Sequence, residues 1–326
     1  MIRDRDITAF LHAKGSTVLA VFLACVSCAF AWERGAVVRI AGNLGYGFPS
    51  ANLWLGFDWV SAVVNLGVNV LVAGLTVYIN RAFNVLRSLT ALVATMFVVM
   101  QMAFPSVLGQ FYGGTLLAVV ILLCVMLLFS VFGNALGQRR VFLIFFLLGG
   151  AAFTQVAYLF YVPVLLLGCI QMRMFSLRTF LAALLGLVTP AWILFGFGLV
   201  DPVSLSWPEM TLVWSLFDTR EMAQAIASTG FSIVAGGIFL VANLLKILSY
   251  NSRVRAFNGF LALLFIFTAV FTLLNFNNFT FYVPLLNCLG AYQVGHFFTY
   301  RRHRRSYIAI LLLMACYAGF YVWAVA

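Results

Sequence analysis

The chain is built mainly from apolar segments that approach the length of a membrane crossing. A helix needs about 20 apolar residues to cross roughly 30 Å of hydrocarbon. The chain is 64% hydrophobic and 8% charged, whereas a soluble domain is about 25% charged. We therefore predict an all-α bundle of about eleven transmembrane helices that forms a single integral membrane domain over residues 1–326. The predicted segments lie near 16–32, 57–79, 88–104, 113–133, 141–155, 157–171, 178–199, 229–249, 256–274, 279–298 and 306–325.

Charged residues divide between the two faces of this predicted bundle. When the chain is threaded back and forth through the membrane, one face receives most of the 19 Lys and Arg residues, with Asp4 and Asp6 as its acids. The basic residues on the other face are Arg34, Arg39 and Arg220, and its acids are Glu33, Asp58, Asp201, Glu209, Asp218 and Glu221. Because basic loops are retained in the cytoplasm, we expect the N-terminus inside and the C-terminus outside.

Segments 141–155 and 157–171 are short and are separated by little more than Val156. Instead of two full crossings they can form a re-entrant pair, which is tolerated where protein covers the exposed backbone. Removing both leaves the rest of the topology unchanged, so charge counting does not decide between these alternatives.

Two longer loops are expected on the outer face, at residues 33–56 and 200–228. The first is rich in Gly and Asn, which favours an ordered, turn-rich loop. In the second, residues 209–227 can form an amphipathic helix that lies on the membrane surface.

Composition and motifs exclude several classes of function. The sequence pI is about 9.7, but the basic residues are scattered beside apolar helices, whereas nucleic-acid modules gather them on one soluble face. We therefore expect the lipid bilayer, and no nucleic acid, as a partner. Cys25 and Cys28 are three residues apart, but no second Cys pair or His lies near them in sequence to complete a metal site. No cofactor is predicted.

Glu33 and Asp58 are the candidate catalytic residues. They flank the first outer loop, at the end of the first predicted helix and the start of the second. A carboxylate at the membrane surface can deprotonate an acceptor hydroxyl while a lipid phosphate leaves. The alternative is structural: Glu33 pairs with Arg34 at the interface, and Asp58 caps the second helix.

Arg34, Arg39 and Arg220 are the candidate phosphate-binding residues. All three lie on the predicted outer face, and a guanidinium can bind a phosphate through two parallel hydrogen bonds. The alternative for Arg220 is a solvated helix start, capped by Asp218 or Thr219.

Polar amides occur at membrane depth. Asn65 and Asn69 are four residues apart and share a helix face with Ser61. Such a stripe usually hydrogen-bonds a neighbouring helix, although a solute pathway can use the same groups. The predicted membrane interior contains no Asp, Glu or Lys, so the usual relay of a proton-coupled pump is absent.

Three stretches resemble a family of uncharacterised multi-span inner-membrane proteins of Bacteroidota. They are Tyr78–Asn84 running into Ser88–Leu92, Phe132–Gly137 with Gly149–Ala152, and Tyr161–Pro163 with Phe180–Pro190. The resemblance implies a multi-pass protein of the bacterial inner, or cytoplasmic, membrane with an undefined activity. The short paired helices are also similar to those of multi-span polyprenyl-dependent glycosyltransferases, although only Glu33 of the usual acidic pair precedes the Gly/Asn-rich stretch.

These observations favour an envelope-glycan enzyme or accessory that acts on a polyprenyl-linked substrate at the outer leaflet. One alternative is a non-enzymatic scaffold that partners another membrane protein in an envelope complex. Another is a transporter of a small solute or lipid.

Overall fold

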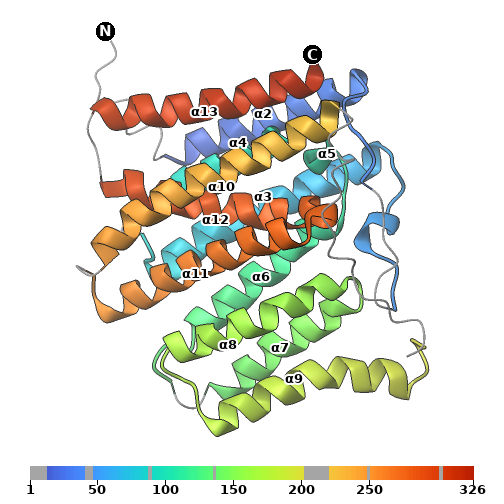
Figure 1. Cartoon of the computed structure of the whole chain (residues 1–326), viewed down its shortest axis with the longest axis vertical. Helices are drawn as coiled ribbons and strands as arrows, with labels where there is room; N and C mark the ends of the chain where they lie inside the picture. Colours follow the sequence, from blue (N-terminus) through green and yellow to red (C-terminus); the bar gives the residue numbers. More distant parts are fainter. Residues whose placement is uncertain are drawn as a thin grey trace.

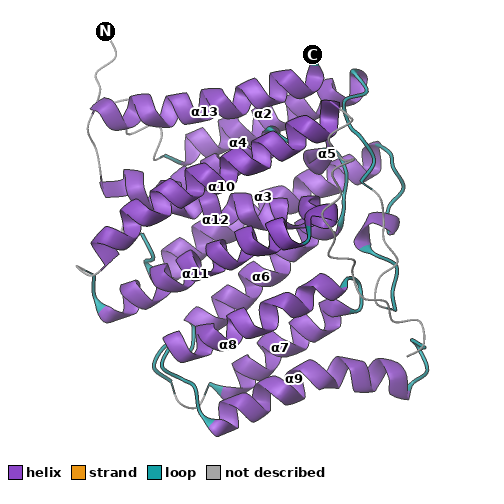
Figure 2. Cartoon of the chain, in the orientation of Figure 1, coloured by secondary structure: helices purple, strands orange, loops and turns teal. Residues whose placement is uncertain are grey.

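The computed structural model describes residues 13–40, 47–86, 90–134, 137–201, 220–247, 250–300 and 304–326. Within these ranges the chain forms helices and connecting turns but no β-strand (Figure 2). The helices are α2 (Lys14–Glu33), α3 (Trp59–Phe83), α4 (Leu92–Met102), α5 (Pro105–Leu108), α6 (Gly113–Phe129), α7 (Gln138–Ala152), α8 (Tyr161–Gln171), α9 (Leu177–Gly196), α10 (Arg220–Ile247), α11 (Ser252–Leu274), α12 (Phe279–Tyr300) and α13 (Arg304–Val325). Short 3-10 turns occur at η1 (Ala51–Leu53), η2 (Val156–Phe160) and η5 (Phe276–Asn278).

Each predicted apolar segment contains a helix, which confirms the all-α class. In the described part of the chain, six helices are long and apolar enough to cross a membrane: α2, α3, α9, α10, α11 and α13. Others are shorter, and the 11 residues of α4 or α8 span only about 16 Å. The eleven-span count and the orientation therefore remain predictions.

The start of α10 differs from the predicted boundary. The helix begins at Arg220, whereas the apolar run predicts a segment from residue 229. Residues 220–227, expected in a surface helix, are instead the first turns of a long helix, and residues 209–219 lie outside the described ranges. Gln224 and Ser228 lower the hydropathy of this stretch, yet both are buried against neighbouring helices.

The bundle is organised around α4 and α12 (Figure 1). α12 packs against α4, α6, α10 and α11, while α4 also contacts α2, α3 and α13. α7, α8 and α9 gather at one edge, at the bottom of Figure 1, and α13 lies at the opposite edge. α7 joins this group to the rest through α6, and α8 through α11.

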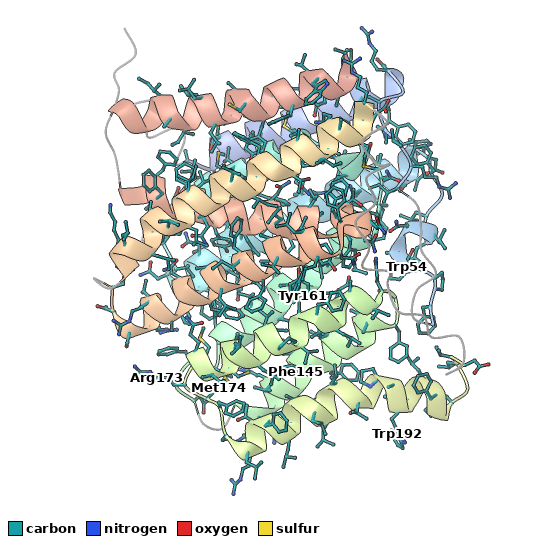
Figure 3. All side chains as sticks on the ribbon, in the orientation of Figure 1. Trp54, Phe145, Tyr161, Arg173, Met174 and Trp192 are labelled. Carbon is teal, nitrogen blue, oxygen red and sulfur yellow. The ribbon has the colours of Figure 1, made fainter. Side chains whose placement is uncertain are left out.

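The outer surfaces of the peripheral helices are apolar. Trp192 of α9 is 75% exposed and Leu245 of α10 is 80% exposed, and Figure 3 shows Trp192 projecting away from the bundle. Soluble monomers rarely expose large contiguous apolar patches. These surfaces are those of a membrane protein, solvated by lipid.

A chain of buried polar side chains crosses the interior. Asn65 donates hydrogen bonds from Nδ2 to the carbonyls of Val107 and Leu108, both at 2.8 Å, and its Oδ1 accepts one from Thr115 Oγ1 at 2.8 Å. Ser61 Oγ accepts from the Phe111 amide at 2.8 Å. The predicted role of the Ser61, Asn65 and Asn69 stripe in helix contacts is thereby confirmed, and it satisfies the backbone where the helix is interrupted between α4 and α6.

The same chain continues to α12. Gln101 donates from Nε2 to Asn69 Oδ1, and Asn287 donates from Nδ2 to Gln101 Oε1, both at 2.9 Å. Asn65, Gln101 and Asn287 are fully buried. Because hydrocarbon offers a polar group no alternative partner, these bonds fix how α3, α4 and α12 meet.

The two ends of the bundle differ in charge. One end, called here the basic end, carries Lys14, Arg81, Arg139, Arg140, Arg173, Arg178, Lys246, Arg253 and Arg255, at the ends of α2, α3 and α7 to α11. The other, called the acidic end, carries Glu33, Arg34, Arg39, Asp58, Asp201, Arg220 and Glu221. In Figure 3 the labelled Arg173 and Trp54 mark the basic and acidic ends respectively.

Candidate functional site

The candidate site lies at the acidic end, where α2 ends and α3 begins. The rings of Trp32 and Phe57 lie 5.0 Å apart, so the residues that follow Trp32 and those that follow Phe57 are neighbours. Trp32 is also fixed by its indole N–H, which donates to the Gly109 carbonyl at 3.0 Å. The structure therefore places the end of α2, which carries Glu33 and Arg34, and the start of α3, which Asp58 caps, at the same end of the bundle.

Glu33 and Arg34 are both exposed. The Arg34 guanidinium carbon lies 5.2 Å from the centre of the Phe30 ring, a cation–π distance. Within the described residues, Glu33 and Arg34 form no ion pair with each other. Both charged groups therefore remain open to a ligand that approaches from solution or from the membrane surface.

Asp58 caps α3. Its Oδ1 accepts a hydrogen bond from the Ser61 amide at 3.1 Å, and its backbone is extended, as is usual at an N-cap. The structural alternative proposed for Asp58 is confirmed. The side chain is also exposed, so capping leaves the carboxylate accessible.

The remaining arginines lie at the same end but in other surroundings. Arg220 begins α10, and its Nη2 donates to the Trp323 carbonyl of α13 at 3.4 Å. Arg39 is exposed and precedes Ile40, which packs against the core. α13 connects Arg220 to α2, because Tyr321 donates from its hydroxyl to the Ser27 carbonyl at 2.7 Å.

Glu221 has a position that the sequence did not indicate. It lines a pocket of about 40 Å³ together with Ala36, Ile40, Phe104, Pro105, Ser106, Val107, Gln224, Ala225, Thr280 and Ala324. The pocket lies where α10, α12, α13 and the segment after α2 meet, and most of its lining is apolar. Its volume suits two or three water molecules or one small substituent. In the sequence, Glu221 is only an acidic residue near a helix start. An acid in the first turn is favoured by the helix dipole, so this position alone does not indicate a pocket.

Gln224 fixes the wall of this pocket. Its Nε2 donates to the Ala103 carbonyl at 2.7 Å and to the Phe320 carbonyl at 2.9 Å, which ties α10 to the end of α4 and to α13. Among the described residues there is no group of three or more His, Cys, Asp or Glu side chains that could hold a metal ion.

No family model, curated protein or solved structure matches this chain. The function is therefore inferred from the geometry of the acidic end.

Proposed function

We propose that this membrane protein acts on a lipid-linked substrate at the outer leaflet, as an envelope-glycan enzyme or accessory, with its acidic end facing outward. The observation that supports this proposal is the exposed grouping of Glu33, Arg34 and Asp58 at two adjoining helix ends. Exposed aromatic side chains surround them: Phe30, Trp54, Phe57 and Trp59. Aromatic residues concentrate at membrane–water interfaces, which is where the phosphate of a membrane lipid lies.

The proposed chemistry is transfer of a sugar from a polyprenyl phosphate or diphosphate to an acceptor hydroxyl. The acceptor oxygen forms a bond to the anomeric carbon, and the bond from that carbon to the phosphate oxygen breaks. The phosphate leaves with the electron pair, and Glu33 or Asp58 takes the acceptor proton. Arg34, with Arg39 or Arg220, stabilises the negative charge on the phosphate.

The proposed location is the bacterial inner membrane, as the resemblance to Bacteroidota inner-membrane proteins implies. The division of charge between the basic and acidic ends supports this placement, because the positive-inside rule puts the basic end in the cytoplasm.

Substitutions at Asp58 separate chemistry from folding. Asn is as good an N-cap as Asp, so Asp58→Asn removes the negative charge and keeps the cap, whereas Asp58→Ala removes both. In cells that lack the chain, we expect Asp58→Asn or Glu33→Gln to fail to restore the envelope glycan while the protein accumulates normally. Full restoration by the Glu33→Gln, Asp58→Asn double variant would contradict the enzymatic proposal.

Binding of a polyprenyl diphosphate to the purified chain in nanodiscs tests the phosphate site. Loss of charge-assisted hydrogen bonds weakens binding by about 10- to 100-fold, which is the loss expected for Arg34→Gln. Arg178→Gln at the basic end is the matched control and should bind as the wild type does. Equal affinity in both variants would contradict the assignment of Arg34.

The second candidate is a non-enzymatic scaffold of an envelope complex. The observation that favours it is the network of Asn65, Asn69, Gln101 and Asn287, whose buried amides hydrogen-bond one another across three helices. A scaffold predicts that the Glu33 and Asp58 variants are silent and that a defined membrane protein co-purifies in stoichiometric amount. The same network gives the amides a structural role, which removes the main argument for a transporter.

A further inference from the structure

A second, polar hollow adjoins the Glu221 pocket. It is lined by Ile40, Ser50, Asn52, Tyr112, Gln155, Asn278, Thr280 and Phe281, and it shares Ile40 and Thr280 with the Glu221 pocket. Its volume is about 10 Å³, which is room for one water molecule or one hydroxyl group. Four stretches far apart in sequence meet here: the segment after α2, the start of α6, the turn before α8 and the turn before α12.

Hydrogen bonds to the backbone hold the walls of the hollow. Asn52 Oδ1 accepts from the Gly113 amide at 2.7 Å, and Tyr112 donates from its hydroxyl to the Thr280 carbonyl at 3.1 Å. Burial raises the pKa of Tyr112 well above its ordinary value, so this hydroxyl stays protonated and remains a donor. The Phe48 amide donates to the Phe153 carbonyl at 3.0 Å, which ties the loop before α3 to the end of α7.

Three other side chains in the lining keep their hydrogen-bonding capacity unused. Ser50 is 2% exposed, and its Oγ has no partner in the described part of the chain. The carboxamides of Gln155 and Asn278, both partly buried, likewise make no hydrogen bond to a described residue. A buried polar group without a partner costs about 1–3 kcal/mol. The Ser50 hydroxyl is such a group, and the carboxamides of Gln155 and Asn278 lie in the same lining with donors and acceptors available to a ligand that pairs with it.

Gly113 keeps the hollow open. A Cβ at this position would lie 2.7 Å from Gln155 Oε1 and 3.1 Å from the Phe281 ring, so a larger residue would push the Gln155 carboxamide aside. The glycine also leads directly into α6, which places its amide against Asn52.

The lining defines the chemical class of the ligand. It contains three hydroxyls and three carboxamides, which both donate and accept hydrogen bonds, and no charged side chain. Anions select guanidinium or ammonium groups, and hard cations select carboxylates. A neutral hydroxyl matches this set, and the neighbouring pocket adds an apolar wall and the Glu221 carboxylate.

We propose that the hollow formed by Ser50, Gln155 and Asn278 is a specificity subsite that receives one hydroxyl of the sugar carried by the lipid-linked substrate. This inference rests on the proposed function. The remainder of the sugar lies outside the hollow, toward the Glu221 pocket, and the lipid phosphate lies toward the arginines of the acidic end. A hollow that admits one hydroxyl distinguishes sugars that differ at a single stereocentre.

The test compares polyprenyl diphosphates carrying single hexose epimers with the same polyprenyl diphosphate without sugar. The full-length chain in nanodiscs should bind one epimer more tightly than the others and than the sugar-free lipid. Ser50→Ala, Asn278→Ala and Gly113→Ala should each reduce that preference by about five- to tenfold, the worth of one hydrogen bond, while affinity for the sugar-free lipid is unchanged. Ser130→Ala at the basic end is the control and should keep the preference.

Two outcomes separate this inference from the proposed function. If the sugar-free lipid binds through Arg34 but all epimers bind alike, or if Ser50→Ala keeps the preference, the hollow holds only water and the subsite assignment is overturned. If neither form of the lipid binds, the proposed function fails as well. Gly113→Ala also alters the start of α6, so the thermal unfolding of this variant is measured together with its binding. If Gly113→Ala unfolds at a lower temperature than the wild type, the Ser50→Ala result alone decides the test.

Discussion

The Asn65 side chain links three helices in the interior of the bundle. From α3 it hydrogen-bonds two carbonyls of α5 and the Thr115 hydroxyl of α6. Asn65→Leu leaves these three groups buried without their partner. Each unsatisfied group costs about 1–3 kcal/mol in a soluble protein, and hydrogen bonds between membrane helices average about 0.6 kcal/mol. We expect the unfolding temperature in detergent to fall by several degrees, measured by tryptophan fluorescence.

Thr115→Val is the graded comparison for this prediction. It removes one bond to Asn65 and leaves the two carbonyl bonds in place, so its unfolding temperature should fall by less than that of Asn65→Leu. An Asn65→Leu protein as stable as the wild type would show that the amide network does not hold α3 to α5.

Single residues differ in how well the sequence predicts them. The stripe of Ser61, Asn65 and Asn69 follows from helical spacing alone, and the cap by Asp58 follows from its position before an apolar run. Glu221 could not be assigned to a pocket, because the pocket walls come from the segment after α2 and from α5, α10, α12 and α13. The hollow around Ser50 was missed for the same reason: its lining residues are up to 241 positions apart, from Ile40 to Phe281.

Among the described elements, α7 and α9 make the most extensive helix–helix contact, and glycine permits it. A Cβ on Gly149 of α7 would lie 2.7 Å from the Leu187 carbonyl oxygen, which is rigid backbone of α9. Gly149→Ala should therefore force the two helices apart and lower the unfolding temperature. Small residues allow close backbone approach in membrane helix pairs, so the effect should exceed the helix-propensity gain of about 1 kcal/mol.

Gly150 is the control for this prediction. It is the next residue on α7, and a Cβ there would meet nothing within 4 Å. Gly150→Ala should be neutral or slightly stabilising. If both alanine variants unfold at the wild-type temperature, the contact between α7 and α9 is looser than this geometry requires.

The existence of helices was predictable, and their lengths were less so. Runs of apolar residues located every described helix except the one-turn α5, because the chain must satisfy its backbone within each segment when lipid surrounds it. The short α4 and the turn at α5 follow from tertiary partners, since the carbonyls of Val107 and Leu108 are satisfied by Asn65 of another helix. Hydropathy does not detect a hydrogen-bond partner on another helix. It therefore predicted a segment at 88–104 that is longer than α4.

At the scale of the whole molecule, charge separates the two ends of the bundle. The described residues of the basic end include Arg81, Arg139 and Arg178, and the acidic end holds Glu33, Asp58 and Glu221. The helix pair of α7 and α8 links the two ends, because it starts beside Arg139 and its tip reaches the loop that contains Phe48. The turn between α7 and α8 therefore contacts the loop before α3, which belongs to the acidic end.

We predict the orientation of the molecule from this separation, and single cysteines can measure it. The positive-inside rule places the basic end in the cytoplasm, so a membrane-impermeant maleimide added to intact spheroplasts should label Arg39→Cys and should not label Arg178→Cys. Arg178→Cys should become reactive once the membrane is opened. The unsubstituted chain is the control, since its exposed cysteines, Cys25 and Cys316, lie within the apolar helices α2 and α13 and should face lipid. Labelling of Arg178→Cys but not of Arg39→Cys in intact spheroplasts would show that the protein has the opposite orientation. The proposed site for an outer-leaflet substrate would then face the cytoplasm.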